Sequence, residues 1–181
     1  GFNGRFTGSV NGAAPVAGTV APLTNGTGVR IGSKDAGAVM RAAGIFTRGR
    51  GGALDMTLRP RKTTGVYDGD LTIRNIRVVD APVLAELLGA VSVIGLLEQL
   101  NGSGILFGDV QGKFLLTPDA VEISEGSAIG ASLGVSGQGV YRSDTRVVDL
   151  RGTISPIYLL NGIGTIFSKS REGLFGFNYR L

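Results

Sequence analysis

The side chains that most often perform catalysis or hold transition metals are scarce in this sequence. It contains no His and no Cys, so the commonest general base, the thiol nucleophile and the usual zinc ligands are missing. The carboxylates in the middle of the chain are Glu98, Asp109, Asp119, Glu122 and Glu125. Asp119 lies in a predicted turn, and Glu122 alternates with apolar neighbours as a solvated strand charge does. We therefore expect no enzyme activity, no cofactor and no metal site.

Basic residues are the other group that could act chemically, by binding an anion. Residues 1–62 contain nine basic and two acidic residues, whereas residues 63–181 contain nine basic and twelve acidic ones. The densest cluster consists of Arg48, Arg50, Arg59, Arg61 and Lys62. Such a cluster predicts contact with lipid headgroups or nucleic acid. Lysine and arginine also occur on solvated strand edges, where they discourage unwanted pairing. Both interpretations stay open from the residues alone.

Apolar and polar residues alternate with period two along most of the chain, which predicts β-strands. The pattern is clear in residues 2–10 and 53–59 and in several segments after residue 104. Asn11-Gly12 and Asn25-Gly26 are hairpin signals, so neighbouring strands should be antiparallel. The apolar positions of residues 66–79 change face part-way, which predicts a bulge or bend near Asn75.

Residues 80–102 form the longest apolar stretch and predict a helix. Asp80 is a candidate N-cap, and Asn101-Gly102 supplies a stop. The apolar residues cover nearly the whole circumference, so the helix should be buried in protein or meet lipid. A membrane span is a further alternative, at the short end of the roughly 17–25 residues that a bilayer requires. Gly89 and Gly95 predict a bend or a split into two helices.

Two further helices are predicted, a short one over residues 36–43 and an apolar one over residues 157–167. Glycine, present 31 times, falls within several strand patterns, where it often marks a bend. These patterns predict a mainly β fold with two apolar helical segments, in which a strongly curved antiparallel sheet, a half-pipe or groove, wraps over the helices. The whole chain, 1–181, should form one domain.

Several motifs in the second half occur in a recognisable order. The apolar helix LLGAVSVIGLLEQLNGSGILF is followed by strands, by DLRGTISPIYLLN over residues 149–161, and by the closing GLFGFNYRL. In residue type and order these motifs resemble the C-terminal region of the AsmA-like proteins of Gram-negative bacteria. The resemblance is best over residues 52–181. It carries over no catalytic or metal motif.

The resemblance implies a function and a location for the chain. AsmA-like proteins are taken to lie in the periplasm, anchored to the inner membrane by an N-terminal helix that is absent from this chain. They are taken to carry phospholipids towards the outer membrane along a β-sheet groove with an apolar interior, of which this chain would be the C-terminal end. The implied partners are phospholipid, a membrane surface and an outer-membrane protein, and no nucleic acid is expected.

The candidate lipid-binding residues share an apolar side chain that the pattern places toward the interior. They are Leu106, Val110, Phe114, Leu133, Val135, Val148, Leu150 and Ile154 on strands, and Leu87, Leu88, Val91 and Ile94 on the helix. The basic cluster is the candidate headgroup site. Two alternatives remain: a cap or docking domain that closes the groove and binds an outer-membrane partner, and a fragment of an outer-membrane barrel, which the apolar helices disfavour.

Overall fold

The computed structural model describes residues 3–90, 94–145, 147–156 and 177–180. The strands are β1 (Gly4–Val10), β2 (Ala14–Leu23), β3 (Gly26–Ser33), β4 (Gly49–Arg50), β5 (Ala53–Pro60), β6 (Tyr67–Val78), β7 (Ile105–Leu116), β8 (Ala120–Gly130), β9 (Leu133–Arg142), β10 (Val148–Pro156) and β11 (Phe177–Arg180). The helices are α1 (Ala36–Ala42), α2 (Pro82–Ala90) and α3 (Ile94–Asn101). The prediction of a mainly β fold is confirmed.

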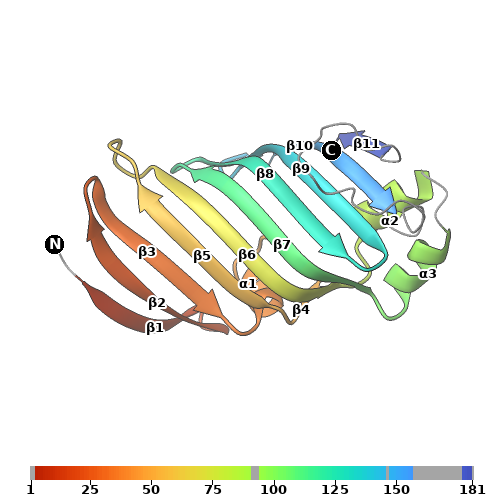
Figure 1. Ribbon diagram of the computed structural model, residues 1–181, viewed down its shortest axis with the longest axis horizontal. Coiled ribbons are helices and arrows are strands. Elements are labelled where there is room, and N and C mark those ends of the chain that lie inside the picture. The colour runs from red at the N-terminus through yellow and green to blue at the C-terminus, as the bar shows by residue number, and fades with distance from the viewer. Residues whose placement is uncertain (1–2, 91–93, 146, 157–176, 181) are drawn as a thin grey trace.

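Within the described residues, the strands form one 11-stranded sheet. Its order is β1-β2-β3-β5-β6-β7-β8-β9-β10-β11, and β4 pairs with β6 beyond the end of β5. Every pair is antiparallel, as the hairpin signals predict. At the first of those signals, Asn11 and Gly12 adopt φ values of 48° and 72°, the left-handed conformation that a tight hairpin turn requires. The sheet is open, with β1 and β11 at its two ends (Figure 1).

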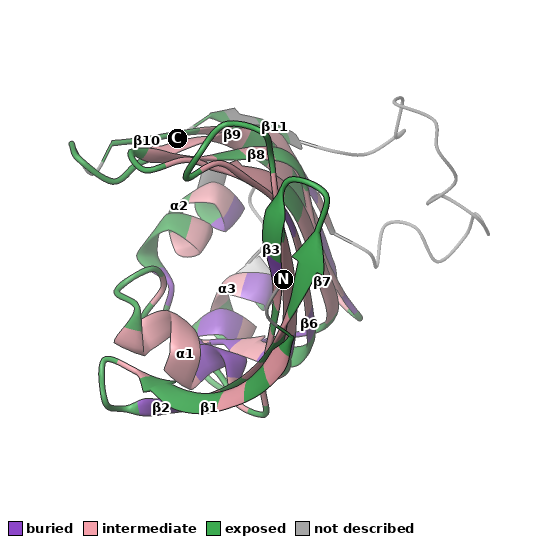
Figure 2. Ribbon diagram, turned by 90° about the vertical axis from the view of Figure 1, so that its left-hand side faces the viewer, coloured by how far each residue is buried: buried purple, intermediate pink, exposed green. Residues whose placement is uncertain are grey.

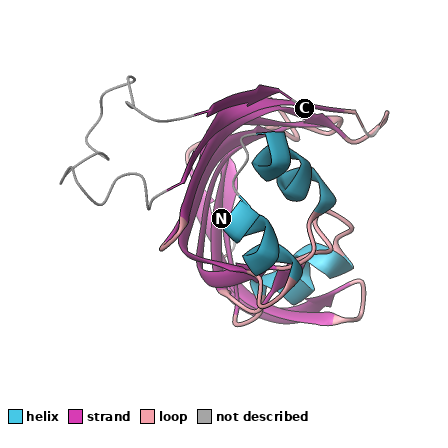
Figure 3. Cartoon of the chain, turned by 90° about the vertical axis from the view of Figure 1, so that its right-hand side faces the viewer, coloured by secondary structure: helices cyan, strands magenta, loops and turns pink. Residues whose placement is uncertain are grey.

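The three helices that the structure describes lie on the same side of the sheet (Figures 2 and 3). In both views the strands bend around this side, which we call the inner face, and we call the opposite side the outer face. The side chains of Leu88, Leu96 and Leu100 are buried in one core cluster with strand residues of the inner face, among them Ile73 and Ile105. No polar or charged residue of the described part is buried, so apolar packing is the main attachment of α2 and α3 to the sheet. The start of α1 is also held by the N–H groups of Ala36 and Gly37, which donate to the carbonyls of Gly52 and Gly51.

The predicted bend near Asn75 is confirmed. Asn75 has a φ of 58°, and it divides β6 into a part that pairs with β5 and a part that pairs with β4. On the neighbouring strand the β7–β8 register shifts between Phe107 and Asp109. Because the left-handed residue interrupts the alternation, Ile73 and Ile76 are both buried in the core, although strict alternation would place residues three positions apart on opposite faces.

The same irregularity corrects the predicted face of Leu106. Strict alternation with Val110 would place Leu106 on the inner face. In the structure Ile105 and Phe107 enter the core instead, while Leu106 is 41% exposed and lies opposite Arg77 of β6. The register shift at Gly108 adds one residue between the two halves of β7, and an added residue reverses the face of every side chain beyond it.

The apolar stretch 80–102 contains two helices, α2 and α3, as its glycines predict. The predicted cap is not formed. Asp80 has a φ of 43°, and its carboxylate accepts a hydrogen bond from Arg48 at 2.8 Å. The predicted stop is confirmed, since α3 ends at Asn101 and Gly104, with a φ of 81°, donates its N–H to the carbonyl of Gln99. None of the described helices has both the length and the apolarity needed to cross a membrane.

The short helix predicted over residues 36–43 is confirmed as α1. The carboxylate of Asp35 accepts the N–H of Ala38 at 2.8 Å and so caps the helix start, as an N-cap aspartate does. Gly44, with a φ of 70°, follows its end. The apolar helix predicted over residues 157–167 lies outside the described residues, and the final predicted strand is described over β11.

The bulge in β7 predicts opposite responses from two adjacent aliphatic positions. Ile105→Asp should unfold the domain, because Ile105 is fully buried and the change buries an unpaired charge. Leu106→Asp should change the free energy of unfolding by less than about 0.5 kcal/mol, as exposed substitutions do. Chemical denaturation of both variants measures the difference. Equal loss of stability would contradict the register.

Candidate functional site

Three rows of residues cross the inner face perpendicular to the strands, and the ladder registers define each of them. The first row is apolar and contains Ile73, Val110, Ala128, Val135 and Ile154, each directly opposite the next on the neighbouring strand. Ile73 and Ile154 belong to the core, and the other three pack against it. This row therefore belongs to the part of the inner face that packs in the core with the helices.

The second row consists of glycines from four adjacent strands. Gly112, Gly126, Gly137 and Gly152 pair with one another in that order from β7 to β10. A Cβ at Gly152 would lie 1.8 Å from the backbone oxygen of Ser136, and one at Gly126 would lie 2.9 Å from that of Gly137. Because the backbone of the neighbouring strand lies so close at Gly126 and Gly152, no side chain fits at these two positions. The glycine row is therefore a strip of backbone without side chains between the first row and the next apolar row.

The third row lies beyond the glycines, nearer the hairpins that join β7 to β8 and β9 to β10. It contains Phe114, Ile123, Gly139 and Leu150, again as direct partners on successive strands. Phe114, Ile123 and Leu150 are half-buried, and none of them packs against the core cluster. Val148, on the same face at the start of β10, is 44% exposed. This part of the inner face is apolar but is not covered by the described helices.

The structure divides the predicted lipid-binding residues among different environments. Leu88, Leu133 and Ile154 are fully buried in the core, and Leu87, Val110 and Val135 pack against it. Phe114 and Leu150 are half-buried outside it, while Leu106 and Val148 are exposed. Val91 and the side chain of Ile94 lie outside the described part. Only Phe114, Leu150 and Val148 therefore remain as predicted positions on the uncovered part of the inner face.

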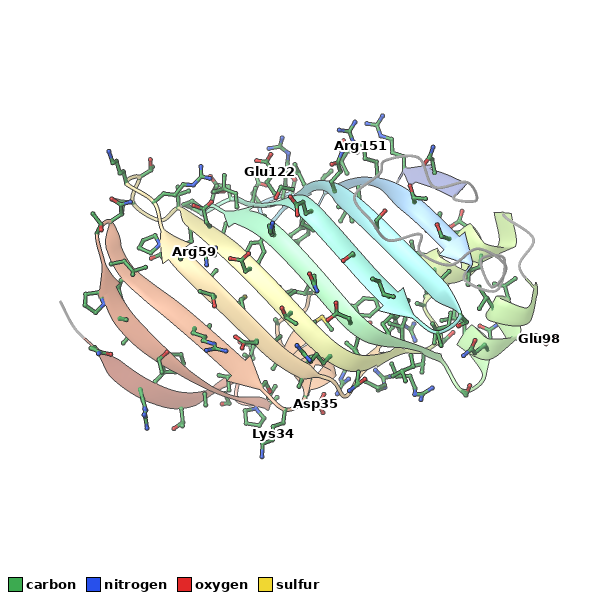
Figure 4. The ribbon with its side chains drawn as sticks, viewed as in Figure 1. Lys34, Asp35, Arg59, Glu98, Glu122 and Arg151 are labelled. Carbon is green, nitrogen blue, oxygen red and sulfur yellow. The ribbon has the colours of Figure 1, made fainter. Side chains whose placement is uncertain are left out.

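The predicted basic cluster is split between two places. Arg50 belongs to β4 and Arg48 directly precedes this strand, whereas Arg59, Arg61 and Lys62 lie at the far end of β5. Arg59 forms an ion pair with Asp70, and Arg61 pairs with Asp68 at 2.7 Å. Figure 4 shows Arg59 toward the edge of the sheet opposite Lys34 and Asp35. The five basic side chains therefore cannot hold one headgroup together.

Cross-strand ion pairs also shift the pKa of two outer-face carboxylates. The guanidinium of Arg30 hydrogen-bonds to Asp55 and lowers the pKa of that carboxyl below its ordinary value. The hydrogen bonds from Arg61 do the same to the pKa of Asp68. Both pairs are exposed to water, so they contribute little stability, but they neutralise much of the basic charge of β3 and β5.

A hollow of about 640 Å³ lies on the outer face. Its walls are mainly small polar side chains, including Thr72, Gln111, Ser127, Ser136, Thr153 and Asn178. Lys113 and Glu125, also in its wall, pair with each other at 3.2 Å. The hollow is thus polar and largely charge-balanced, unlike the inner face, and it does not provide an apolar site.

The candidate carboxylates do not converge. Glu98 lies on α3, at the right-hand end of the view in Figure 4, and Glu122 lies on β8, near the middle of the upper edge. Within the described residues, no three acidic side chains gather as metal ligands would. Glu125 pairs with Lys113, and Asp109 accepts a hydrogen bond from Gln111. Their arrangement offers no paired acid and base.

Two features of the site escaped the sequence analysis. The glycine row depends on the registers of four strands, so single-strand patterns do not reveal it. Arg41 and Arg77 meet the β4 segment only through the fold, the first from α1 and the second from β6. A partial signal existed, since Arg41 follows the apolar positions of a predicted helix directly before the basic cluster.

Comparison with protein-family models gives no match, and comparison with curated proteins and with solved structures gives none either. The function must therefore be argued from the described geometry.

The glycine row predicts different responses at two of its positions. Gly152→Ala should lower the free energy of unfolding by about 1–3 kcal/mol, because the added methyl group meets backbone. Gly112→Ala should be neutral or slightly stabilising, since its Cβ would meet nothing closer than Leu71 at 3.8 Å. Urea denaturation of the two variants tests this, and equal destabilisation would contradict the described close approach at Gly152.

The Arg30–Asp55 pair predicts a measurable change in acid titration. Because the folded-state pKa of Asp55 is lowered, its contribution to stability is present above the unfolded pKa and is lost as the pH falls through the folded pKa. In Arg30→Gln the pKa of Asp55 should rise towards its ordinary value of 3.8. A carbon-13 NMR titration of the carboxyl measures it, with Lys62→Gln as the control that leaves it unchanged.

Proposed function

We propose that this domain binds phospholipid by its acyl chains along the inner face of the sheet. In this proposal the curved sheet is a half-pipe and forms the C-terminal end of a longer groove that carries phospholipids between the inner and outer membranes of the Gram-negative envelope. The domain then works in the periplasm as a lipid-transfer module and contributes to outer-membrane homeostasis. Phospholipid and a membrane surface are its partners.

The observation that carries the proposal is the uncovered apolar row of the inner face. Phe114, Ile123 and Leu150 are half-buried outside the core, and the glycine row beside them adds no polar side chain to this part of the inner face. Covering such residues with an acyl chain is favourable by roughly 0.8 kcal/mol for each methylene group that leaves water. Acyl burial needs no charged partner, which agrees with the absence of buried polar residues in the described part.

A second candidate function is a cap that closes a groove and docks an outer-membrane protein. The observation that favours it is the packing of Leu88, Leu96 and Leu100 into the inner face, which fills part of the space that a conduit would leave open. The two candidates differ in the uncovered row: a conduit exposes it to acyl chains, whereas a cap needs no lipid there.

A charge placed on the uncovered row tests the proposal. The full chain, purified under native conditions, should carry phospholipid that mass spectrometry identifies, and should take up a phospholipid with a fluorescent acyl chain from liposomes. Ile123→Glu should reduce uptake at least about tenfold, because a carboxylate beside an acyl chain loses its hydration. Val135 is a poorer target, since it packs against the core and its replacement would also affect folding.

The matched control is Gln111→Glu, which adds the same charge at an exposed position of the outer-face hollow. It should leave uptake unchanged, and thermal melting should show that both variants are folded. If the native chain carries no phospholipid and takes none from liposomes, or if both variants lose uptake equally, the lipid proposal is overturned and the cap is favoured.

A further inference from the structure

A pair of arginines faces each other across the short ladder between β4 and β6. Arg50 is the direct partner of Arg77 in this antiparallel register. Directly opposed side chains have Cβ atoms roughly 4.5–5.5 Å apart, and like charges in such a pair destabilise a sheet. Among the described residues, neither arginine forms an ion pair with a carboxylate. The pair is thus a site of repulsion that a bound anion would relieve.

A third guanidinium joins them from α1. Arg41 donates to the carbonyl oxygen of Gly49, and Arg50 donates to that same oxygen at 2.9 Å and to the carbonyl of Thr47 at 2.8 Å. Arg77 is held at 3.0 Å by the carbonyl of Ser103. Because each guanidinium has five N–H donors, these backbone contacts fix the three side chains and still leave donors available.

The nearby charges leave this corner strongly positive. Arg48 lies between Arg41 and Arg50 in the sequence. It pairs with Asp80 at 2.8 Å, so its charge is neutralised. Arg41, Arg50 and Arg77 have no acidic partner among the described residues. Elsewhere on the sheet the arginines of β3 and β5 are each paired with an aspartate. We call the group of Arg41, Arg48, Arg50 and Arg77 the basic corner.

An apolar side chain projects from the loop that carries this corner. Ile45 lies between α1 and β4 and is 74% exposed, more than the other large hydrophobic residues that the structure describes as exposed. A single exposed isoleucine is common on protein surfaces. Ile45 follows Arg41 by four residues and precedes Arg50 of β4 by five. Basic residues that meet phosphates, together with an apolar residue that enters the acyl boundary, are typical of surfaces that lie on anionic membranes.

We propose that the basic corner docks the domain onto an anionic phospholipid bilayer, with lipid phosphates bound by Arg41, Arg50 and Arg77 and with Ile45 inserted among the acyl chains. This inference rests on the proposed function for the class of ligand, and it adds the surface through which the groove meets its membrane. Arginine suits the phosphate because its planar guanidinium donates two parallel hydrogen bonds. The bilayer is preferred to free phosphate because only a bilayer provides a partner for Ile45.

Binding of the full chain to vesicles tests the inference. The protein should sediment with vesicles of equal parts phosphatidylcholine and phosphatidylglycerol, and not with phosphatidylcholine alone. The double variant Arg50→Gln with Arg77→Gln should weaken binding by about fivefold for each arginine removed, and added salt should weaken the native protein more than the variant. Ile45→Ser should weaken binding while leaving its salt dependence unchanged.

The controls use the opposite edge of the sheet. Lys62→Gln with Arg142→Gln removes two charges there, and Leu23→Ser removes an apolar side chain that is 47% exposed. None of these variants should melt at a lower temperature than the native protein, and the controls should bind vesicles as the native protein does. Loss of binding in the controls equal to that in the corner variants would overturn the inference, as would an absence of native binding to anionic vesicles.

Two further arms separate membrane docking at the corner from phosphate binding and from lipid uptake in the groove. If the protein binds inorganic phosphate in the absence of vesicles and Ile45→Ser binds vesicles as the native protein does, the corner is a discrete phosphate site and the docking inference is overturned. Ile123→Glu should still bind vesicles, and the corner variants should still take up phospholipid presented in detergent micelles. If the native protein takes up phospholipid but does not bind anionic vesicles, only the docking inference is refuted. If it binds the vesicles but takes up no phospholipid, the proposed lipid binding by the inner face is refuted instead.

Discussion

Packing of the α2 and α3 leucines against the inner face is the interaction on which the rest of this structure depends. An open antiparallel sheet with one apolar face must cover that face or expose it to water, and here the cover comes from Leu88, Leu96 and Leu100. The described core has no buried polar residue to supplement it. The core cluster does not extend to the third row, however, and the side chains of that row remain outside it. The apolar inner face thus has one part that is packed in the core and another part, the third row, that a ligand could contact.

The bend at Asn75 and Gly108 makes that packing possible. If β6 and β7 kept strict alternation, Ile76 and Phe107 would point to the outer face and the base of the core would lose two large side chains. The left-handed residue in β6 and the register shift in β7 occur at the same level of the sheet, so both strands change face together. A polar residue of small size at position 75 tolerates this conformation better than a β-branched one would.

The charged residues lie mainly on the outer face, whereas the apolar packing is on the inner face. The outer face matches opposite charges across neighbouring strands, as in Arg30–Asp55, Arg59–Asp70 and Arg61–Asp68. Exposed pairs of this kind add little stability, but they leave the outer face close to neutral. The corner around β4 departs from the pattern, because Arg50 and Arg77 face each other across the strands and neither has a carboxylate partner among the described residues. The sheet has another such arginine pair, Arg151 and Arg180, but there Arg180 pairs with Asp149. That contrast, more than the number of basic residues, is what marks the corner as a surface for an anion.

The sequence by itself determined the class of fold and most of its strands. Alternation is a local property, and Asn-Gly pairs specify tight turns through their own backbone preferences, so the antiparallel strands, the capped helix after Asp35 and the split of the long apolar stretch were predictable. Only the tertiary structure decided which apolar side chains are covered. The register shift at Gly108 places Phe107 in the core and leaves Leu106 exposed, where strict alternation predicts the reverse. It also decided the partners of the charges: Arg59 meets Asp70, and Asp80 binds Arg48 instead of capping a helix. Burial and ion pairing join residues that meet only across strands, and a pattern along one strand does not contain that register.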